Sequence, residues 1–445
     1  MEIATEQIEP FDEEDLQAAD LHLAARVGDP AVAAAVTVPS SGAIEALPAA
    51  LFPRRRERAR TWLSEAARRE LLWICVIYVA ARVALLVAAF IQSRFGHAPF
   101  QNELANWDGM WYRELANKGY PGYVSYAQTT LGFFPLFPLM IWPVEHLLLP
   151  LFPTQLQLAA TLAGSLVSSV GGLIATVLVH RLAEGWWDRE TARRATILFV
   201  LFPGSVVFTM VYSEGVLLPL VAGCIYALER RHWLLAGVLA GFATAVQPVG
   251  LALGPVCALA ALLELRRAGF TREGLRSFIA PLLSVTGAAA FMGYLWLHTG
   301  SPFANYLAQH HGWSESTSVF SLWHAAQKLA GQVSFAHFNV PTIDLNLPQG
   351  LIGGVLLLVL LAILLLRARR QVSPPAIAWS LAIAFFALTS SNVPPNPRML
   401  FTAFPALLTL ARYVPRRWFP ALAWVNGTLL VGLGLLCFFG MTLRP

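Results

Sequence analysis

The sequence predicts an all-α polytopic membrane protein, and three observations support this fold class. The 445-residue chain is 56% hydrophobic and only 13% charged, about half of the roughly 25% that soluble domains carry. Its apolar residues form long continuous runs that must be surrounded by lipid or by one another. Short arginine clusters separate these runs. Because charge placed in this way sets membrane topology, the net charge of +5 does not indicate nucleic-acid binding.

The first 53 residues are predicted to be a disordered acidic tail. Residues 1–50 contain ten of the 26 acidic residues and a single arginine, Arg26. They lack the basic region and apolar core of a signal peptide. A basic cluster at 54–69 then precedes the first apolar run, 71–91, and such a cluster holds its side of the membrane in the cytoplasm. The tail is therefore expected to be cytoplasmic, and residues 54–445 to form the transmembrane domain of a plasma-membrane protein.

The remaining apolar runs predict about eleven crossings in total. They lie at 131–150, 156–180, 195–211, 214–228, 233–247, 249–264, 277–297, 349–366, 374–390, 398–411 and 419–440. Cytoplasmic placement of the arginine-bearing connectors leaves the loops 93–130 and 298–348 outside. The run 131–150 carries Pro135, Pro138 and Pro143, which remove backbone hydrogen bonds, so it is predicted to be re-entrant, interfacial or broken.

The first extracytoplasmic loop contains a predicted amphipathic helix. Trp107, Trp111 and Leu115 recur at helical spacing, and Gly119 is a natural C-terminal stop. A helix of this pattern suits the outer membrane face. Asp108 falls in its first turn, where the spacing alone favours a contact to the helix dipole and leaves a functional role as the alternative.

Six short motifs occur in a shared order between about residues 70 and 415. They are WDGMWYRELANKGY at 107–120, FFPLFPLM at 133–140, YSEG at 212–215, RRHWLLAG at 230–237, TGSPF at 299–303 and PRML at 397–400. In this order the sequence resembles the PIG-V-type mannosyltransferases and their bacterial relatives, which are membrane glycosyltransferases of the GT-C type.

The resemblance implies a GT-C-like fold and the transfer of a sugar from a polyprenyl-phosphate donor to an acceptor on the outer membrane face. The acceptor is a glycan, a lipid or a protein. In that group the catalytic carboxylate lies in the first outside loop, so Asp108 is expected to be the base of an inverting transfer. A lipid-phosphate donor needs no nucleotide-binding domain, and no DxD element is present, so neither a cofactor nor a metal is expected.

Further site residues follow from the matching positions. Candidates for binding the donor phosphate are Arg398, Arg113 and Lys118, for which interfacial snorkelling or simple solvation is the alternative. Candidates for binding the sugar or acceptor are polar and aromatic side chains of the motifs and of the long outside loop: Trp107, Tyr112, Tyr120, Glu214, Gln247, Gln309, His310 and Trp313. Gln247 stands where relatives often carry an arginine, which puts the identity of the donor in question.

Two other functions are compatible with the sequence. A lipid-linked sugar flippase or secondary transporter would also be polytopic, but transporters usually show paired halves with interrupted helices, and no such pairing is found. A catalytically weak scaffold of the same family is the third hypothesis, motivated by Gln247.

Overall fold

In a computed structural model of the chain, residues 65–96, 99–332, 344–391, 393–438 and 443–445 are described. Their regular structure is helical throughout, apart from one isolated antiparallel bridge between Thr317 and Ser390. The predicted all-α class is therefore confirmed. The predicted tail, residues 1–53, lies outside the described residues.

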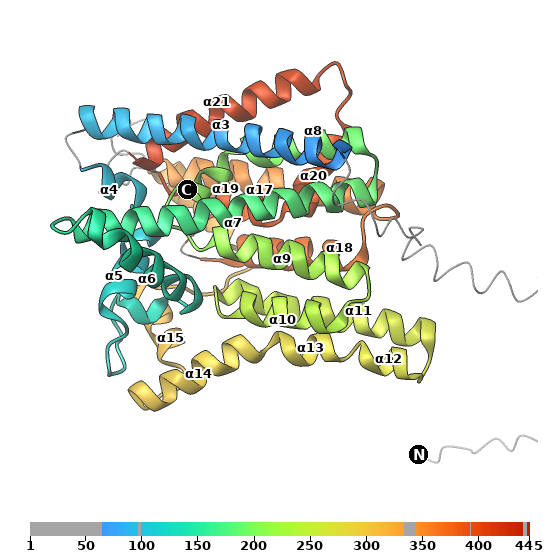
Figure 1. The fold of residues 1–445 in the computed structure, drawn as a ribbon, viewed down its shortest axis with the longest axis horizontal. Helices are drawn as coiled ribbons and strands as arrows, with labels where there is room; N and C mark the ends of the chain where they lie inside the picture. The colour runs from blue at the N-terminus through green and yellow to red at the C-terminus, as the bar shows by residue number, and fades with distance from the viewer. Residues whose placement is uncertain (1–64, 97–98, 333–343, 392, 439–442) are drawn as a thin grey trace, which may run out of the picture. The chain divides into compact units, whose positions relative to one another are not determined.

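Six helical segments in the described part of the chain are long and apolar enough to cross a membrane. They are α3 (Glu65–Phe95), α7 (Leu156–Trp186), η4 with α11 (Pro248–Ala268), α12 to α14 (Arg272–Thr299), α17 with η8 (Asn346–Ala368) and α21 (Phe419–Phe438) (Figure 1). The chain is thus a multi-pass integral membrane protein.

Several predicted spans are shorter or interrupted, so the predicted number of about eleven crossings is not reached by helix length. The run 195–211 divides into α8 (Arg189–Leu201) and the 3-10 turn η3 (Pro203–Phe208), and the run 398–411 divides into α19 (Pro397–Thr402) and α20 (Phe404–Tyr413). A proline lies in the first two positions of the helix after each break. It interrupts the helix because it cannot donate a backbone hydrogen bond. Three further predicted spans form short, uninterrupted helices: α9 (Glu214–Glu229), α10 (Trp233–Thr244) and α18 (Pro374–Thr389).

The proline-rich run 131–150 is broken, which is one of the three alternatives predicted for it. It consists of η1 (Thr130–Gly132), α6 (Leu136–Leu148) and η2 (Leu149–Leu151), with Pro143 inside α6. A 13-residue helix is about 20 Å long at 1.5 Å per residue, which is less than the roughly 30 Å of a hydrocarbon core. Helix α6 alone therefore does not cross a bilayer.

Helices α7 and α9 pack with their backbones in close approach. A Cβ atom added to Gly171 would lie 1.9 Å from the carbonyl oxygen of Gly215, and one added to Gly215 would lie 2.4 Å from the Cα of Ser168. Small residues at a membrane helix interface permit this distance. Ser168 Oγ also donates a 2.7 Å hydrogen bond to the carbonyl of Tyr212, so the first turn of α9 is fixed against α7.

A buried arginine stabilises the break between α8 and η3. Arg82 of α3 is 4% exposed, and its Nη2 donates to the carbonyl of Val200 at 3.1 Å and to Ser205 Oγ at 3.0 Å. The carbonyls at the end of a helix have no partner within the helix, and a buried donor supplies one. The irregular backbone that leads to Tyr212 is thereby held in place.

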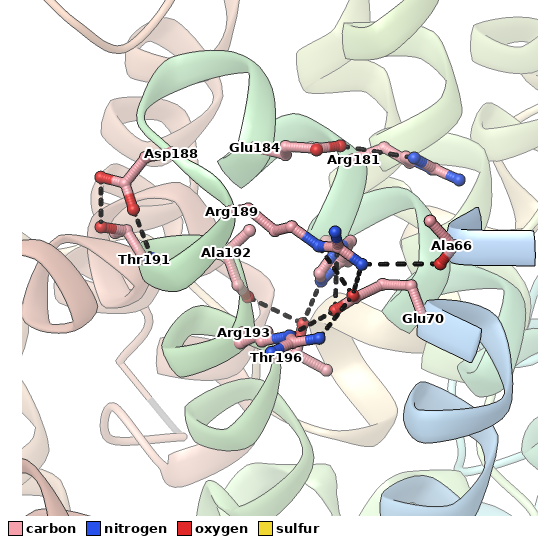
Figure 2. A network of polar contacts seen from close by, with 11 residues as sticks. Ala66, Glu70, Arg181, Glu184, Asp188, Arg189, Thr191, Ala192, Arg193 and Thr196 are labelled. Atoms are coloured by element: carbon pink, nitrogen blue, oxygen red, sulfur yellow. Dashed lines mark hydrogen bonds and ion pairs between the residues drawn. The ribbon is translucent and has the colours of Figure 1, made fainter. Parts of the chain in front are cut away.

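The arginine-bearing connectors gather at one end of the helices. Figure 2 shows Arg189 and Arg193 converging on Glu70 of α3, with 2.8 Å from the Nε of each to a carboxylate oxygen. Further contacts join the connectors to one another: Arg412 with Asp188, Arg416 with Glu190, Arg231 and Arg267 with Glu264, and Tyr413 with the carbonyl of Arg367. The predicted placement of these connectors on one side of the membrane agrees with this arrangement.

The opposite end carries the predicted outside loops. Helices α4 (Phe100–Leu104), α5 (Asp108–Lys118) and α15 (Ala304–Leu307) lie there, together with α6 (Figure 1). Which end faces the cytoplasm stays a prediction.

Candidate active site

Helix α5 begins at Asp108 because of the residues before it. The Asn106 side chain donates a 3.1 Å hydrogen bond to the carbonyl of Phe438, at the end of α21. Trp107 adopts φ +58°, a conformation that is strained for a large side chain and turns the chain into the helix. Gly119, with φ +70°, ends the helix. The predicted helix and its stop are thus confirmed. The helix was expected to suit the outer membrane face, and its buried side chains pack on α6 and α7 of the protein.

Arg398 meets Asp108 from the first turn of α19. Asn396 caps this helix, accepting a 3.0 Å hydrogen bond from the backbone N–H of Met399, and Pro397 occupies the first helical position, where proline is favoured. Arg398 Nη1 lies 2.5 Å from Asp108 Oδ2, and the guanidinium sits over the ring of Tyr212 at 5.3 Å from its centroid. The Asp108 side chain is 36% exposed and the Arg398 side chain 19%.

Glu214 is the second carboxylate on Arg398. It opens α9, is 3% exposed, and its Oε1 lies 3.6 Å from Arg398 Nε. The same oxygen accepts a 3.0 Å hydrogen bond from Gln247 Nε2. Pro248 favours an extended backbone at Gln247, and this directs the amide towards α9. A buried carboxylate needs such partners, because burial of an unpaired charge is costly.

Ser213 links these residues to α5. Its Oγ accepts a 2.5 Å hydrogen bond from Gln247 Nε2 and lies 2.6 Å from the hydroxyl of Tyr112. Burial raises the pKa of Tyr112 above its usual range, so the phenol keeps its proton. Asp108 N–H also donates to the Tyr212 hydroxyl at 3.3 Å. The polar network therefore joins α5, α9, α19 and the turn before η4.

A cavity of about 380 Å³ opens above this network. Aromatic rings form one of its walls: Trp111 stacks on Phe133 at 6.1 Å between centroids, and Trp313 meets both edge-on, at 5.4 and 5.6 Å. Asp108 and Arg398 also line the cavity. A site of this size, apolar with a few convergent polar groups, is typical for a small molecule.

The cavity brings together most of the residues predicted from the sequence. Its lining includes Trp107, Asp108, Tyr112, Gln247, Gln309, Trp313 and Arg398, and Glu214 lies directly behind Arg398. In the described residues no group of three or more His, Cys, Asp or Glu side chains is arranged to hold a metal.

Besides Glu214, four predicted residues do not line the cavity. Arg113 Nη1 donates to Thr161 Oγ1 at 3.3 Å, and Lys118 pairs with Glu114 at 3.1 Å on the exposed face of α5. The Tyr120 hydroxyl donates to the carbonyl of Phe133, and His310 Nδ1 lies 3.0 Å from the carbonyl of Glu315. Their predicted roles stay predictions.

Sequence reasoning missed several lining residues, among them Gln128, Gly132, Phe134, Glu315, Val393 and Arg444. Gly132 has a clear structural reason, because a Cβ atom there would lie 2.7 Å from the Trp313 ring. Its carbonyl accepts a 2.7 Å hydrogen bond from Gln309 Nε2, which fixes the start of the long outside loop. Its place directly before the FFPLFPLM motif was the available signal.

Glu315 forms an acidic part of the lining. Its Oε1 accepts a 2.7 Å hydrogen bond from Ser390 Oγ. Burial raises the pKa of Glu315, while this hydrogen bond and the nearby Arg444 act in the opposite direction. Ser390 also holds the loop before α19, so the wall that carries Glu315 is connected to the segment that positions Arg398.

The model of the family described as Mannosyltransferase (PIG-V) matches residues 79–340, which is more than half of the chain. No curated protein sequence matches this chain.

Among solved structures, ArnT from Cupriavidus metallidurans bound to undecaprenyl phosphate is similar at 17% identity and a TM-score of 0.49, over 82% of this chain and 64% of that one. The oligosaccharyltransferase of Archaeoglobus fulgidus in complex with Zn and sulfate is similar at 14% identity and a TM-score of 0.41, over 81% of this chain and 53% of that one. The chain thus spans less than two thirds of the length of these enzymes. The family match covers α5, the Glu214 turn, Gln247 and the Trp313 wall, and the chain belongs to the PIG-V mannosyltransferase family.

Proposed function

We propose that this mannosyltransferase-family enzyme is of the GT-C type and moves mannose from a polyprenyl-phosphate donor to an acceptor hydroxyl by an inverting displacement with Asp108 as base. The observation that carries the proposal is the Asp108–Arg398 pair at the edge of an aromatic-walled cavity. A carboxylate and a guanidinium side by side provide the two functions that such a displacement requires, a proton acceptor and an anion-binding group.

In the proposed step the acceptor oxygen attacks the anomeric carbon. Its proton passes to Asp108, and the bond between that carbon and the phosphate oxygen breaks, with the electron pair leaving on the polyprenyl phosphate. The transition state has oxocarbenium character, as in other glycosyl substitutions. Because the Asp108 side chain is 36% exposed at the cavity, an acceptor hydroxyl can approach it.

Arg398 is proposed to stabilise the leaving phosphate. Its contacts to Asp108 and Glu214 use Nη1 and Nε, two of the five N–H directions of a guanidinium, so further donors can reach a phosphate oxygen. Glu214 keeps the guanidinium in place from the buried side. A phosphate that engages Arg398 competes with Asp108 for the same cation, which frees the carboxylate to contact the acceptor hydroxyl when the donor is bound.

The cavity walls are proposed to hold the sugar. Trp313 and Trp111 provide flat apolar faces for the C–H face of a hexose, and Gln309 and Gln247 provide amide groups for its hydroxyls. A cavity of about 380 Å³ accommodates one sugar residue, with the lipid chain outside it. The site lies at the end opposite the arginine-bearing connectors, which the positive-inside rule assigns to the cytoplasm. The reaction is therefore proposed to occur on the extracytoplasmic face of the plasma membrane, on a glycan, lipid or protein acceptor.

The test is transfer from radiolabelled polyprenyl-phosphate-mannose by purified protein in lipid, with a membrane lipid extract as the source of acceptor. Wild type is compared with Asp108→Asn, which keeps the shape and hydrogen bonding of the side chain but removes the base. Asp188→Asn is the matched control, since it is the same chemical change at the opposite end and asparagine also caps a helix.

Labelled product from wild type and from Asp188→Asn, with a fall of at least about 100-fold for Asp108→Asn, is the expected result. Equal transfer by all three proteins would remove Asp108 as base and direct attention to Glu214. No transfer by wild type, together with translocation of a lipid-linked sugar in proteoliposomes, would favour the flippase alternative.

A further inference from the structure

Arg444 is a second arginine in the lining of the cavity, and neither the sequence motifs nor the family match includes it. It follows α21, at the far end of the chain from α5 in sequence. Its guanidinium lies 5.3 Å from the ring centroid of Trp107, within the distance at which a cation is attracted to an indole face.

The segment that carries Arg444 is fixed to α17. Its backbone N–H donates to Asn346 Oδ1 at 2.9 Å, and its carbonyl accepts a 3.1 Å hydrogen bond from Gln349 Nε2. The preceding Leu443 is 3% exposed. Because both hydrogen bonds use backbone atoms, they position the side chain at the cavity without depending on it.

Two consecutive residues of the chain thus each contact the side chain of one arginine. Trp107 lies under Arg444, and Asp108 pairs with Arg398. Adjacent Cα atoms are 3.8 Å apart, so both guanidinium groups reach the same dipeptide, where α5 begins. Two guanidinium groups at one site are a recurrent arrangement for binding phosphate, because each presents several directed N–H donors.

The two arginines have different contacts at the cavity. Arg398 contacts two carboxylates, Asp108 and Glu214. Arg444 lies over the Trp107 ring and acts electrostatically on Glu315. A phosphate that enters the cavity therefore meets two guanidinium groups in its lining, one from α19 and one from the segment after α21.

We propose that Arg444 binds the phosphate of the lipid donor and, together with Arg398, forms a two-arginine clamp on it. This inference rests on the proposed function for the identity of the ligand. It assigns donor binding to a residue from the C-terminal segment, while Asp108 and Arg398 carry out the displacement. The ligand class is a phosphate ester, and the membrane location selects the headgroup of a polyprenyl lipid over free phosphate.

The experiment measures binding separately from transfer. Wild type in lipid nanodiscs is titrated with polyprenyl monophosphate, with the uncharged polyprenol, and with inorganic phosphate, and binding is followed by tryptophan fluorescence. The variants are Arg444→Gln and Arg444→Met, the second of which keeps an apolar stem against Trp107. Arg94→Gln is the matched control, because it removes the same charge from an exposed position at the end of α3.

We expect both Arg444 variants to bind polyprenyl monophosphate about tenfold or more weakly, the effect of losing a charge-assisted hydrogen bond. Binding of polyprenol should not change, and Arg94→Gln should match wild type. In the transfer assay the Arg444 variants should raise KM for the donor and leave kcat within about twofold, as for the loss of an interaction made equally in ground and transition states.

Unchanged binding of polyprenyl monophosphate by both variants would overturn the inference, and so would an equal loss of polyprenol binding, which would indicate a packing role. Inorganic phosphate binding as tightly as the lipid would overturn the assignment to a lipid headgroup. Wild type that binds polyprenyl monophosphate through Arg444 but transfers no mannose would contradict the proposed function and leave the phosphate site standing.

Discussion

Arg398 Nη1 lies 2.5 Å from Asp108 Oδ2, although 290 residues separate the two side chains in the sequence. The first turn of α19 and the first turn of α5 thus meet at one ion pair, with Glu214 behind it. The proposed base and the proposed anion-binding group are therefore coupled, and a change in one alters the position and the charge balance of the other.

Replacement of Arg398 should affect both activity and stability. Arg398→Gln leaves Asp108 and the buried Glu214 without their shared cation, and removal of one partner of a buried pair costs about 3–5 kcal/mol. We expect the lower end of this range, because Asp108 is partly exposed. Arg398→Lys keeps the charge, but a single ammonium cannot place donors at both the Nη1 and the Nε positions of the planar guanidinium, so its transfer rate should be intermediate. The measurements are thermal unfolding in detergent and kcat/KM for mannose transfer. If Arg398→Gln unfolded at the wild-type temperature and had the wild-type kcat/KM, the coupling of Asp108 to Arg398 would be contradicted.

Gln247→Glu should introduce a pH dependence. The new carboxylate would lie where Gln247 Nε2 now donates to Glu214 at 3.0 Å. Two carboxylates at this distance repel unless they share a proton, and a shared proton becomes available as the pH falls. We expect transfer to be weak at pH 7.5 and partly restored at pH 5.5, relative to wild type at each pH. Gln247→Met also loses the hydrogen bond but adds no charge, so its relative activity should not recover on acidification.

Local patterns predicted much of the site. The spacing of Trp107, Trp111 and Leu115 and the stop at Gly119 gave the extent of α5, and the position of Asp108 in its first turn agrees with the structure. Such features depend on a few neighbouring residues, whose periodicity and backbone preferences are visible in one sequence.

Features that depend on distant contacts could not be predicted in this way. Arg398 was identified as a cation near a lipid headgroup, but its pairing with two carboxylates follows only from the packing of α19 against α5 and α9. Arg444 lies in no periodic pattern, and it reaches the cavity because hydrogen bonds to α17 fix its backbone. Six helical segments of the described residues are long enough to span a membrane, while other apolar runs form shorter helices. The sequence did not predict this difference, since apolar runs record burial and do not show where proline divides a helix.

The close packing of α7 and α9 predicts a large cost for a single methyl group. Gly171→Ala would place a Cβ atom 1.9 Å from the carbonyl oxygen of Gly215, so the helices must separate. Overpacking of this kind typically costs 1–3 kcal/mol, occasionally more, and it would also shift the adjacent Glu214. Gly185 lies in the same helix with no atom within 4 Å of an added Cβ, so Gly185→Ala is the matched control. We expect a lower melting temperature and lower transfer for Gly171→Ala only. Equal melting temperatures for the two variants would contradict the packing argument.

Stability should fall as the pH rises towards neutrality because of Glu103 in α4. Burial alone raises the pKa of this carboxyl to about 7 from an ordinary value of 4.5, and the side chain is 2% exposed. The folded state therefore keeps its proton in a pH range in which the unfolded state has lost it. The free energy of unfolding decreases from pH 4.5 to about 7 and levels off above that.

Glu103→Gln cannot ionise, so its melting temperature relative to wild type should be higher at pH 8 than at pH 5. Glu114→Gln, a change in a 42%-exposed side chain of the next helix, should give the same difference from wild type at both pH values. A difference for Glu103→Gln that does not change with pH would show that this carboxyl does not titrate in the expected range.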